Sequence, residues 1–217
     1  MQISDLKKYR SFFFAVFAVF AAAALRQIGF HVNEQLDLFC NILRTSIYFG
    51  LFAAWGISVS NRIIQPQVRR YLVAISVLMG FWIAIRGIKY TLDAGPWVMR
   101  HLWYLYYLPM LFIPLLGLFV ATTLDKPDHL RLPKWMNLLY IPTAVLLLLI
   151  LTNDLHQLVF RFPEDAAVWM DDYRYGTVYF PAIGWMVLCA LTALITMLVK
   201  CRIPHSRRVL VLPFVPV

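Results

Sequence analysis

The sequence predicts an all-α fold, a multi-pass transmembrane helical bundle with six complete helices and the start of a seventh. Three observations support this class. The 217 residues are 61% hydrophobic and only 14% charged, whereas soluble domains are about 45–50% apolar and ~25% charged. The mean hydropathy is +0.69. Apolar runs near the roughly 17–25 residues that a bilayer requires recur along the chain, separated by short polar breaks. Soluble globular, disordered and collagen-like classes are therefore excluded.

Six apolar runs are predicted to span the membrane within a single membrane domain over residues 1–217. They cover residues 12–28, 43–60, 71–88, 103–124, 136–152 and 178–199. A last apolar run, 209–217, is too short to cross, so we expect a chain that stops inside its seventh helix. The first run also fits a signal peptide, because basic residues precede it and it contains four successive alanines. A retained anchor is favoured, because the apolar pattern continues past Arg26.

Lysine and arginine are unevenly shared between the two sets of segments that join the spans. Thirteen of the 20 fall in one set and seven in the other. Cytoplasmic loops carry the excess of basic residues, so the N-terminus is predicted to be cytoplasmic. The longest loop, 153–177, then lies outside, and it holds five acidic residues against two basic ones.

Prolines fall inside several predicted spans, at positions 109, 114, 142 and 181. Each removes a backbone donor and favours a kink. Membrane helices tolerate proline where neighbouring groups satisfy the freed carbonyls, and this interpretation is favoured over a bend required for signalling.

The third span carries an unusual polar stripe. Trp82, Arg86, Lys89, Tyr90 and Asp93 share one helical face near the predicted outer end. A charge in this position either extends to the lipid headgroups or faces the interior of the bundle. The second interpretation predicts a site for an anionic ligand or an acidic loop.

The fourth span begins with an aromatic face formed by Trp103, Tyr104 and Tyr107, together with Arg100. Rings of this kind gather at membrane interfaces, so an aromatic belt is the favoured interpretation. A cage that binds a cation through the ring faces is the alternative.

The fifth span ends in polar residues that include Asn153, Asp154 and His156. If the helix continues, Asn153 and His156 share a face and Asp154 points elsewhere. The favoured interpretation of His156 is a helix-end histidine satisfied by its neighbours or by water, and the alternative is a pH sensor or a hydrogen-bond anchor.

The residue patterns do not indicate catalysis or metal binding. The three histidines expected on the outer side are His31, His101 and His156. They lack the H-x-x-x-H or H-E-x-x-H spacing of a zinc site, and the three cysteines are scattered without a C-x-x-C pair. We therefore predict no enzyme activity, no cofactor, no metal and no nucleic-acid partner.

Four stretches of the second half of the chain carry a family resemblance. They read WYLYYLP at 103–109, YIP at 140–142, LTNDLHQLVF at 151–160 and KCRIPHSRR at 200–208. This half, about residues 102–217, resembles the N-terminal seven-helix membrane region of bacterial sensor histidine kinases. The resemblance implies a two-component sensor in the bacterial cell membrane, with a cytoplasmic output domain. A cytoplasmic N-terminus would require eight spans in the complete protein, one more than the family region has.

The sequence thus favours a membrane-embedded sensory input module that detects a small ligand or an envelope state from the outer side. The candidate ligand-binding residues are Arg86, Lys89, Trp103, Tyr104, Tyr107, Asn153, Asp154 and His156. Expected partners are the lipid bilayer, an unidentified small ligand and a cytoplasmic output domain or kinase, with a homodimer left open. The alternative function is a fragment of a multi-pass transporter or a membrane scaffold protein.

One hypothesis links charge to signalling. Basic residues are expected near the outer helix ends, beneath the acidic loop 153–177. They are Arg26, Arg44, Arg86, Lys89 and Arg100. An anionic ligand that competes with the loop carboxylates for these residues would shift the balance between two states of the bundle.

Overall fold

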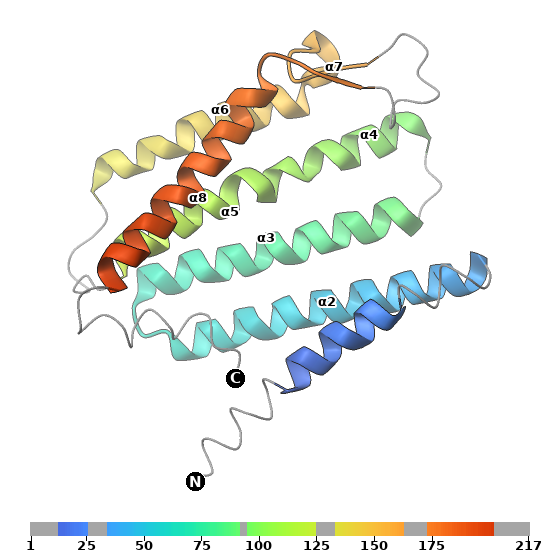
Figure 1. Ribbon diagram of the computed structural model, residues 1–217, viewed down its shortest axis with the longest axis horizontal. Coiled ribbons are helices and arrows are strands. Elements are labelled where there is room, and N and C mark those ends of the chain that lie inside the picture. The colour runs from blue at the N-terminus through green and yellow to red at the C-terminus, as the bar shows by residue number, and fades with distance from the viewer. Residues whose placement is uncertain (1–12, 26–33, 92–94, 125–132, 163–172, 202–217) are drawn as a thin grey trace. The chain divides into compact units, whose positions relative to one another are not determined.

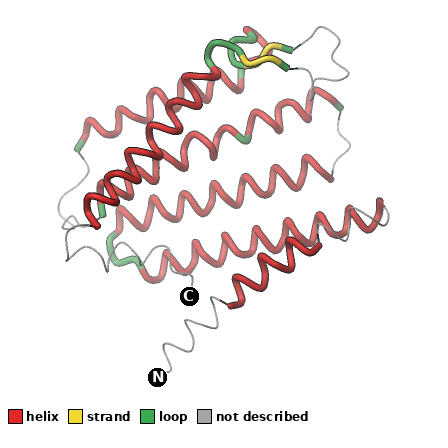
Figure 2. Tube along the Cα trace, viewed as in Figure 1, coloured by secondary structure: helices red, strands yellow, loops and turns green. Residues whose placement is uncertain are grey.

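The computed structural model describes residues 13–25, 34–91, 95–124, 133–162 and 173–201. These residues are mostly helical, with one short β-hairpin (Figure 2). Contacts divide the chain into two compact units, Met1–Asp93 with Lys200–Val217, and Ala94–Val199. One membrane domain over residues 1–217 stays a prediction.

The first unit contains an antiparallel pair of long helices, α2 (Glu34–Arg62) and α3 (Pro66–Thr91), joined by a three-residue turn (Figure 1). A shorter apolar helix, Phe13–Leu25, precedes them. Proline at the first position of α3 suits a helix start, because its missing N–H would have no partner within the helix.

Small residues bring α2 and α3 close together. The Ser76 hydroxyl donates a 2.7 Å hydrogen bond to the carbonyl of Phe52 across the pair. A Cβ at Gly56 would overlap the side chain of Ser76. Such small-residue contacts are how membrane helices pack, since lipid supplies no hydrophobic force between them.

The second unit holds the remaining helices and the hairpin. They are α4 (Pro96–Leu105), α5 (Tyr107–Thr123), the 3₁₀ helix η1 (Lys134–Leu139), α6 (Tyr140–Leu151), α7 (Asn153–His156), β1 (Phe160–Arg161), β2 (Arg174–Tyr175) and α8 (Tyr179–Cys201). Helices α5, α6 and α8 share a core in which Leu111, Ile150 and Ala182 are fully buried. Within it, the Trp185 indole donates a 2.9 Å hydrogen bond to the Thr143 hydroxyl and ties α8 to α6.

Two prolines explain the interruptions in this unit. Pro109 has no N–H to donate to the carbonyl of Leu105, and the helix breaks there, with Tyr106 bonded to Trp103 in a tighter turn. Pro142 likewise cannot donate to Leu138, and the segment before it is a 3₁₀ helix. Proline therefore changes local geometry without ending either span.

The predicted all-α, multi-pass class is confirmed. Within the described residues, five segments are long and apolar enough to cross a membrane: Gln35–Arg62, Pro66–Lys89, Pro96–Thr123, Lys134–Leu151 and Tyr179–Lys200. They match the second to sixth predicted spans, although α2 begins nine residues before the predicted start. The count of six complete helices is not confirmed, because the described helix at the first predicted span, Phe13–Leu25, is shorter than a bilayer requires. The run 209–217 lies outside the described residues.

Helix surfaces in both units expose large apolar side chains. Ile57 on α2 is 64% exposed, and Leu188 and Leu198 on α8 are each 57% exposed. Water would penalise apolar surface on this scale and lipid accepts it. The exposed faces therefore agree with a membrane location.

Candidate functional site

A short hairpin shapes the end of the second unit. Phe160 of β1 pairs with Tyr175 of β2 in antiparallel register. The amide of Gly176 donates a 2.8 Å hydrogen bond to the carbonyl of Val159. A Cβ at Gly176 would overlap the carbonyl of Leu158, so only glycine allows the two chains to approach this closely.

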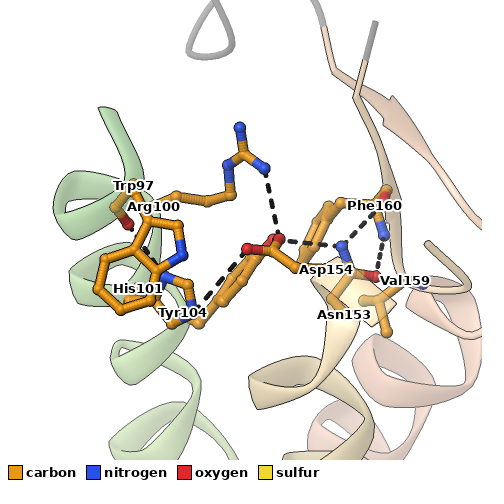
Figure 3. Close-up of polar contacts among 8 residues, drawn as sticks. All are labelled: Trp97, Arg100, His101, Tyr104, Asn153, Asp154, Val159 and Phe160. Carbon is orange, nitrogen blue, oxygen red and sulfur yellow. Dashed lines mark hydrogen bonds and ion pairs between the residues drawn. The ribbon is translucent and has the colours of Figure 1, made fainter. Parts of the chain in front are cut away.

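Asn153 holds the hairpin against α4. Its Oδ1 accepts hydrogen bonds from the amides of Val159 (2.9 Å) and Phe160 (3.0 Å), as Figure 3 shows. Its Nδ2 donates to the carbonyl of Phe160 (2.9 Å) and to the hydroxyl of Tyr104 (3.2 Å). The residue is fully buried. These four bonds use the hydrogen-bonding capacity of the amide, so Asn153 has a structural role here.

Asp154 joins α7 to three residues of α4. The Tyr104 hydroxyl donates a 2.6 Å hydrogen bond to Oδ1 of Asp154, and Nη1 of Arg100 lies 3.4 Å from the same oxygen. Nε2 of His101 lies 3.8 Å from Oδ2 (Figure 3). Nδ1 of His101 is 2.9 Å from the carbonyl of Trp97 and must donate to it, which leaves Nε2 to face the carboxylate. We call Arg100, His101, Tyr104, Asn153 and Asp154 the Asp154 cluster.

Phe160 is the centre of a group of aromatic rings. It is fully buried, and its ring centroid lies 4.5 Å from Trp103, 5.7 Å from Tyr107 and 5.7 Å from Tyr179. The aromatic cluster consists of Trp103, Tyr104, Tyr107, Phe160, Tyr173, Tyr175 and Tyr179. It connects α4, α5, the hairpin and the start of α8 through ring contacts.

Three tyrosines are in contact with one another at the hairpin and the start of α8: Tyr173 contacts Tyr175, and Tyr175 contacts Tyr179. A hydrogen bond with Tyr175, together with burial, raises the pKa of Tyr173 to about 12. Tyr175 in turn stacks on Tyr179, with ring centroids 4.1 Å apart and the planes at 21°. The phenol of Tyr173 is therefore neutral throughout the physiological pH range.

His156 is held by its own neighbours. Its Nδ1 accepts a 3.0 Å hydrogen bond from the amide of Leu158, and its Nε2 lies 3.3 Å from the hydroxyl of Thr152. Gln157, next in the chain, is left-handed (φ 50°) and ends α7. His156 and Asp154 thus have separate partners, although both lie on α7.

Arg86 and Lys89 belong to α3, in the first unit. Arg86 lines a pocket together with residues of α2, and Lys89 is half-buried. The structure brings together Trp103, Tyr104, Tyr107, Asn153 and Asp154 of the predicted site. Tyr104, Tyr107 and Asn153 are buried and act in packing. Ligand binding by any of these residues stays a prediction.

Several residues of the site were missed in the sequence. Phe160 lies inside the motif that carried the family resemblance. A single phenylalanine in the sequence does not predict that its ring is the buried centre of an aromatic cluster. Tyr173, Tyr175 and Tyr179 have a clearer signal, because aromatic rings recur there between a loop and a span. Within the described residues, no three His, Cys, Asp or Glu side chains gather as metal ligands. His31 lies outside those residues.

The fold and the site define a membrane-embedded helical module whose polar side chains tie helix ends together. A family model described as the N-terminal 7TM region of histidine kinase matches residues 42–212. The chain belongs to this family, and it is a membrane sensory input module. The match begins within α2 and extends well before residue 102, where the resemblance predicted from motifs starts. No curated protein and no solved structure matches the chain.

Proposed function

We propose that this module senses a small ligand or an envelope state on the outer side of the bacterial cell membrane and passes the signal through α8 to a cytoplasmic output domain. The observation that carries the proposal is the Asp154 cluster, which connects α4 and α7 and supports the hairpin through Asn153. A change at the hairpin therefore reaches the ends of several helices.

The hairpin and α8 are directly connected. The amide of Val178 donates a 3.1 Å hydrogen bond to the carbonyl of Leu158, one residue before α8 begins. Tyr179, the first residue of α8, stacks on Tyr175 and contacts Phe160. Displacement of the hairpin would therefore move the start of α8, the kind of two-state change that a ligand can bias.

Four of the candidate residues in the second unit differ in accessibility. Tyr104, Tyr107 and Asn153 are buried, so a ligand would act on them by changing the packing of the cluster. The Asp154 side chain is 26% exposed and its partner Arg100 is 16% exposed. A ligand that competes for this ion pair would loosen α4 from α7 with little rearrangement.

The excess of basic residues in one set of joining segments supports a cytoplasmic N-terminus, which places the Asn153 end of α6 outside. The family match favours an input module without enzyme activity over a transporter fragment or a scaffold.

The experiment is a chimera in which the chain is followed by a histidine kinase catalytic domain, assayed in membranes by ATP-dependent phosphorylation. Asp154→Asn should change the phosphorylation level by about threefold or more, because it removes a charge-assisted contact. Asp37→Asn, an exposed residue of α2, is the matched control and should leave it unchanged. Equal phosphorylation by the unsubstituted chimera, Asp154→Asn and Asp37→Asn, at equal expression, would reject the proposal.

A further inference from the structure

A pocket of about 140 Å³ in the first unit is lined by residues of α2 and α3. Its lining residues are Asn41, Arg44, Thr45, Tyr48, Ile83 and Arg86. Five of the six carry hydrogen-bonding side chains, although both helices are otherwise strongly apolar. Polar and charged side chains gathered between two apolar helices are consistent with a site for a polar ligand.

The charge of the pocket is positive. Two guanidinium groups line it, and no carboxylate occurs among the described residues that do so. Oδ1 of Asn41 accepts a 2.7 Å hydrogen bond from Nη2 of Arg44, which positions that guanidinium. Two like charges facing one cavity repel each other and are stabilised by an anion between them.

The two arginines lie at the same level of the helix pair. Arg44 precedes Arg62, the end of α2, by 18 residues, and Arg86 follows Pro66, the start of α3, by 20. At 1.5 Å per residue these separations are about 27 and 30 Å. The hydrocarbon core is about 30 Å thick, so a turn at one interface places the pocket at the headgroup level of the other.

Close packing of the helices fixes the shape of the pocket beside Arg86. A Cβ at Gly87 would lie 2.6 Å from Cγ2 of Thr45, so glycine is required for this approach. Thr45 lines the pocket together with the two arginines. The volume is well below the roughly 300–1,000 Å³ of pockets for drug-sized ligands, which limits the occupant to one small polar group.

We propose that this pocket binds a phosphate group, either of a lipid headgroup or of a free phosphate ion. Arginine binds phosphate through paired hydrogen bonds, and the tetrahedral oxygens can also accept from Asn41, Thr45 and Tyr48. The inference deepens the proposed function, because Arg86 is one of its candidate residues. Phosphate binding is measured without any signalling readout. Failure of the phosphate-binding proposal is therefore distinguishable from failure of the proposed sensing function.

The test uses the full chain purified in a maltoside detergent, which contains no phosphate. In one arm, inorganic phosphate is titrated and binding is followed by calorimetry. In the other, phosphatidylglycerol is added and bound lipid is counted by native mass spectrometry. Arg44→Gln with Arg86→Gln should weaken binding by about tenfold or more in the arm that shows it. Binding of the ion identifies a soluble ligand, and binding of the lipid alone identifies a headgroup.

The control is Arg62→Gln with Arg70→Gln, which removes the same charge from exposed positions on the same two helices. It should retain wild-type affinity. If the variant with Arg44→Gln and Arg86→Gln loses its helical circular dichroism signal, Arg44→Lys with Arg86→Lys takes its place. The lysine variant keeps the charge and should still weaken binding several-fold, because lysine lacks the paired donors. No binding in either arm, or an equal loss in the control, would overturn the proposal.

Discussion

The hydroxyl of Tyr104 donates a 2.6 Å hydrogen bond to Oδ1 of Asp154, across 50 residues of sequence. Tyr104 is fully buried on α4, and Asp154 is partly exposed on α7. The bond therefore joins a residue of the core to one that is partly open to solvent. It is the shortest hydrogen bond among the polar contacts of the Asp154 cluster drawn in Figure 3.

The Tyr104–Asp154 bond should appear as a coupling energy. In a double-mutant cycle of Tyr104→Phe and Asp154→Asn, we expect the two losses in free energy of unfolding to be non-additive by about 1–2 kcal/mol, because the acceptor is charged. Unfolding in mixed micelles, followed by circular dichroism, measures it. Tyr104→Phe combined with Asn137→Ala, an exposed position on η1, should be additive. Additivity in both cycles would contradict the prediction.

Removal of the Asn153 amide should destabilise the second unit strongly. Asn153→Ala leaves the buried amides of Val159 and Phe160 without their acceptor, at a cost of about 2–4 kcal/mol. The same unfolding measurement tests this value, with Asn137→Ala as the control that should change stability by less than about 0.5 kcal/mol. Similar stabilities for the two variants would show that Asn153 does not organise the hairpin.

The packing of α2 on α3 predicts opposite effects at two glycines of the same helix. Gly56→Ala should destabilise the pair, because its Cβ would overlap Ser76. Gly50→Ala meets nothing within 4 Å and should be neutral or stabilising by up to about 1 kcal/mol, since alanine favours a helix. Thermal unfolding of both variants is the measurement. A more stable Gly56→Ala protein would contradict the close contact.

The phenol of Tyr173 should lose its proton at a higher pH than an ordinary tyrosine. Its pKa is raised to about 12 in the folded chain, first by the hydrogen bond with Tyr175 and then by burial. The stabilising contribution of the neutral phenol is therefore present below about pH 10 and is lost as the pH rises from 10 to 12. Ultraviolet absorbance at alkaline pH, compared with Tyr173→Phe, isolates this group. Tyr175→Phe should lower the pKa of Tyr173, and an unchanged value would be inconsistent with the hydrogen bond.

The membrane spans could be predicted from the sequence, and the hairpin could not. Apolar runs of bilayer length predict helices because lipid leaves the backbone few other ways to satisfy its hydrogen bonds. The hairpin has strands of two residues, too short for an alternating pattern, and Asn153 holds it through side-chain bonds to the backbone. The motif that contains Asn153 and Asp154 could be recognised in the sequence, but their partners on α4 lie 49 to 54 residues earlier in the chain. Phe160 could be recognised as a centre only in three dimensions.

Only part of the pocket in the first unit could be predicted from the sequence. Arg86 stood out in its polar stripe, and Arg44 entered only as one of several basic residues near the outer ends. Asn41, Arg44, Thr45 and Tyr48 recur at helical spacing on α2, a pattern that predicts a shared face. The spacing on α2 does not predict the register of α2 on α3, because that register depends on the contacts of Gly56 and Gly87.

Sensing from outside requires that the loop between β1 and β2 lie outside the cell and that the loop between α5 and η1 lie in the cytoplasm. Single cysteines introduced into a cysteine-free chain, as Asp165→Cys in the first loop and His129→Cys in the second, test this directly in intact cells. A membrane-impermeant thiol reagent should modify position 165 and leave position 129 unmodified until the cells are opened. Labelling of position 129 with protection of position 165 would place the Asp154 cluster on the cytoplasmic side and contradict outer-side sensing.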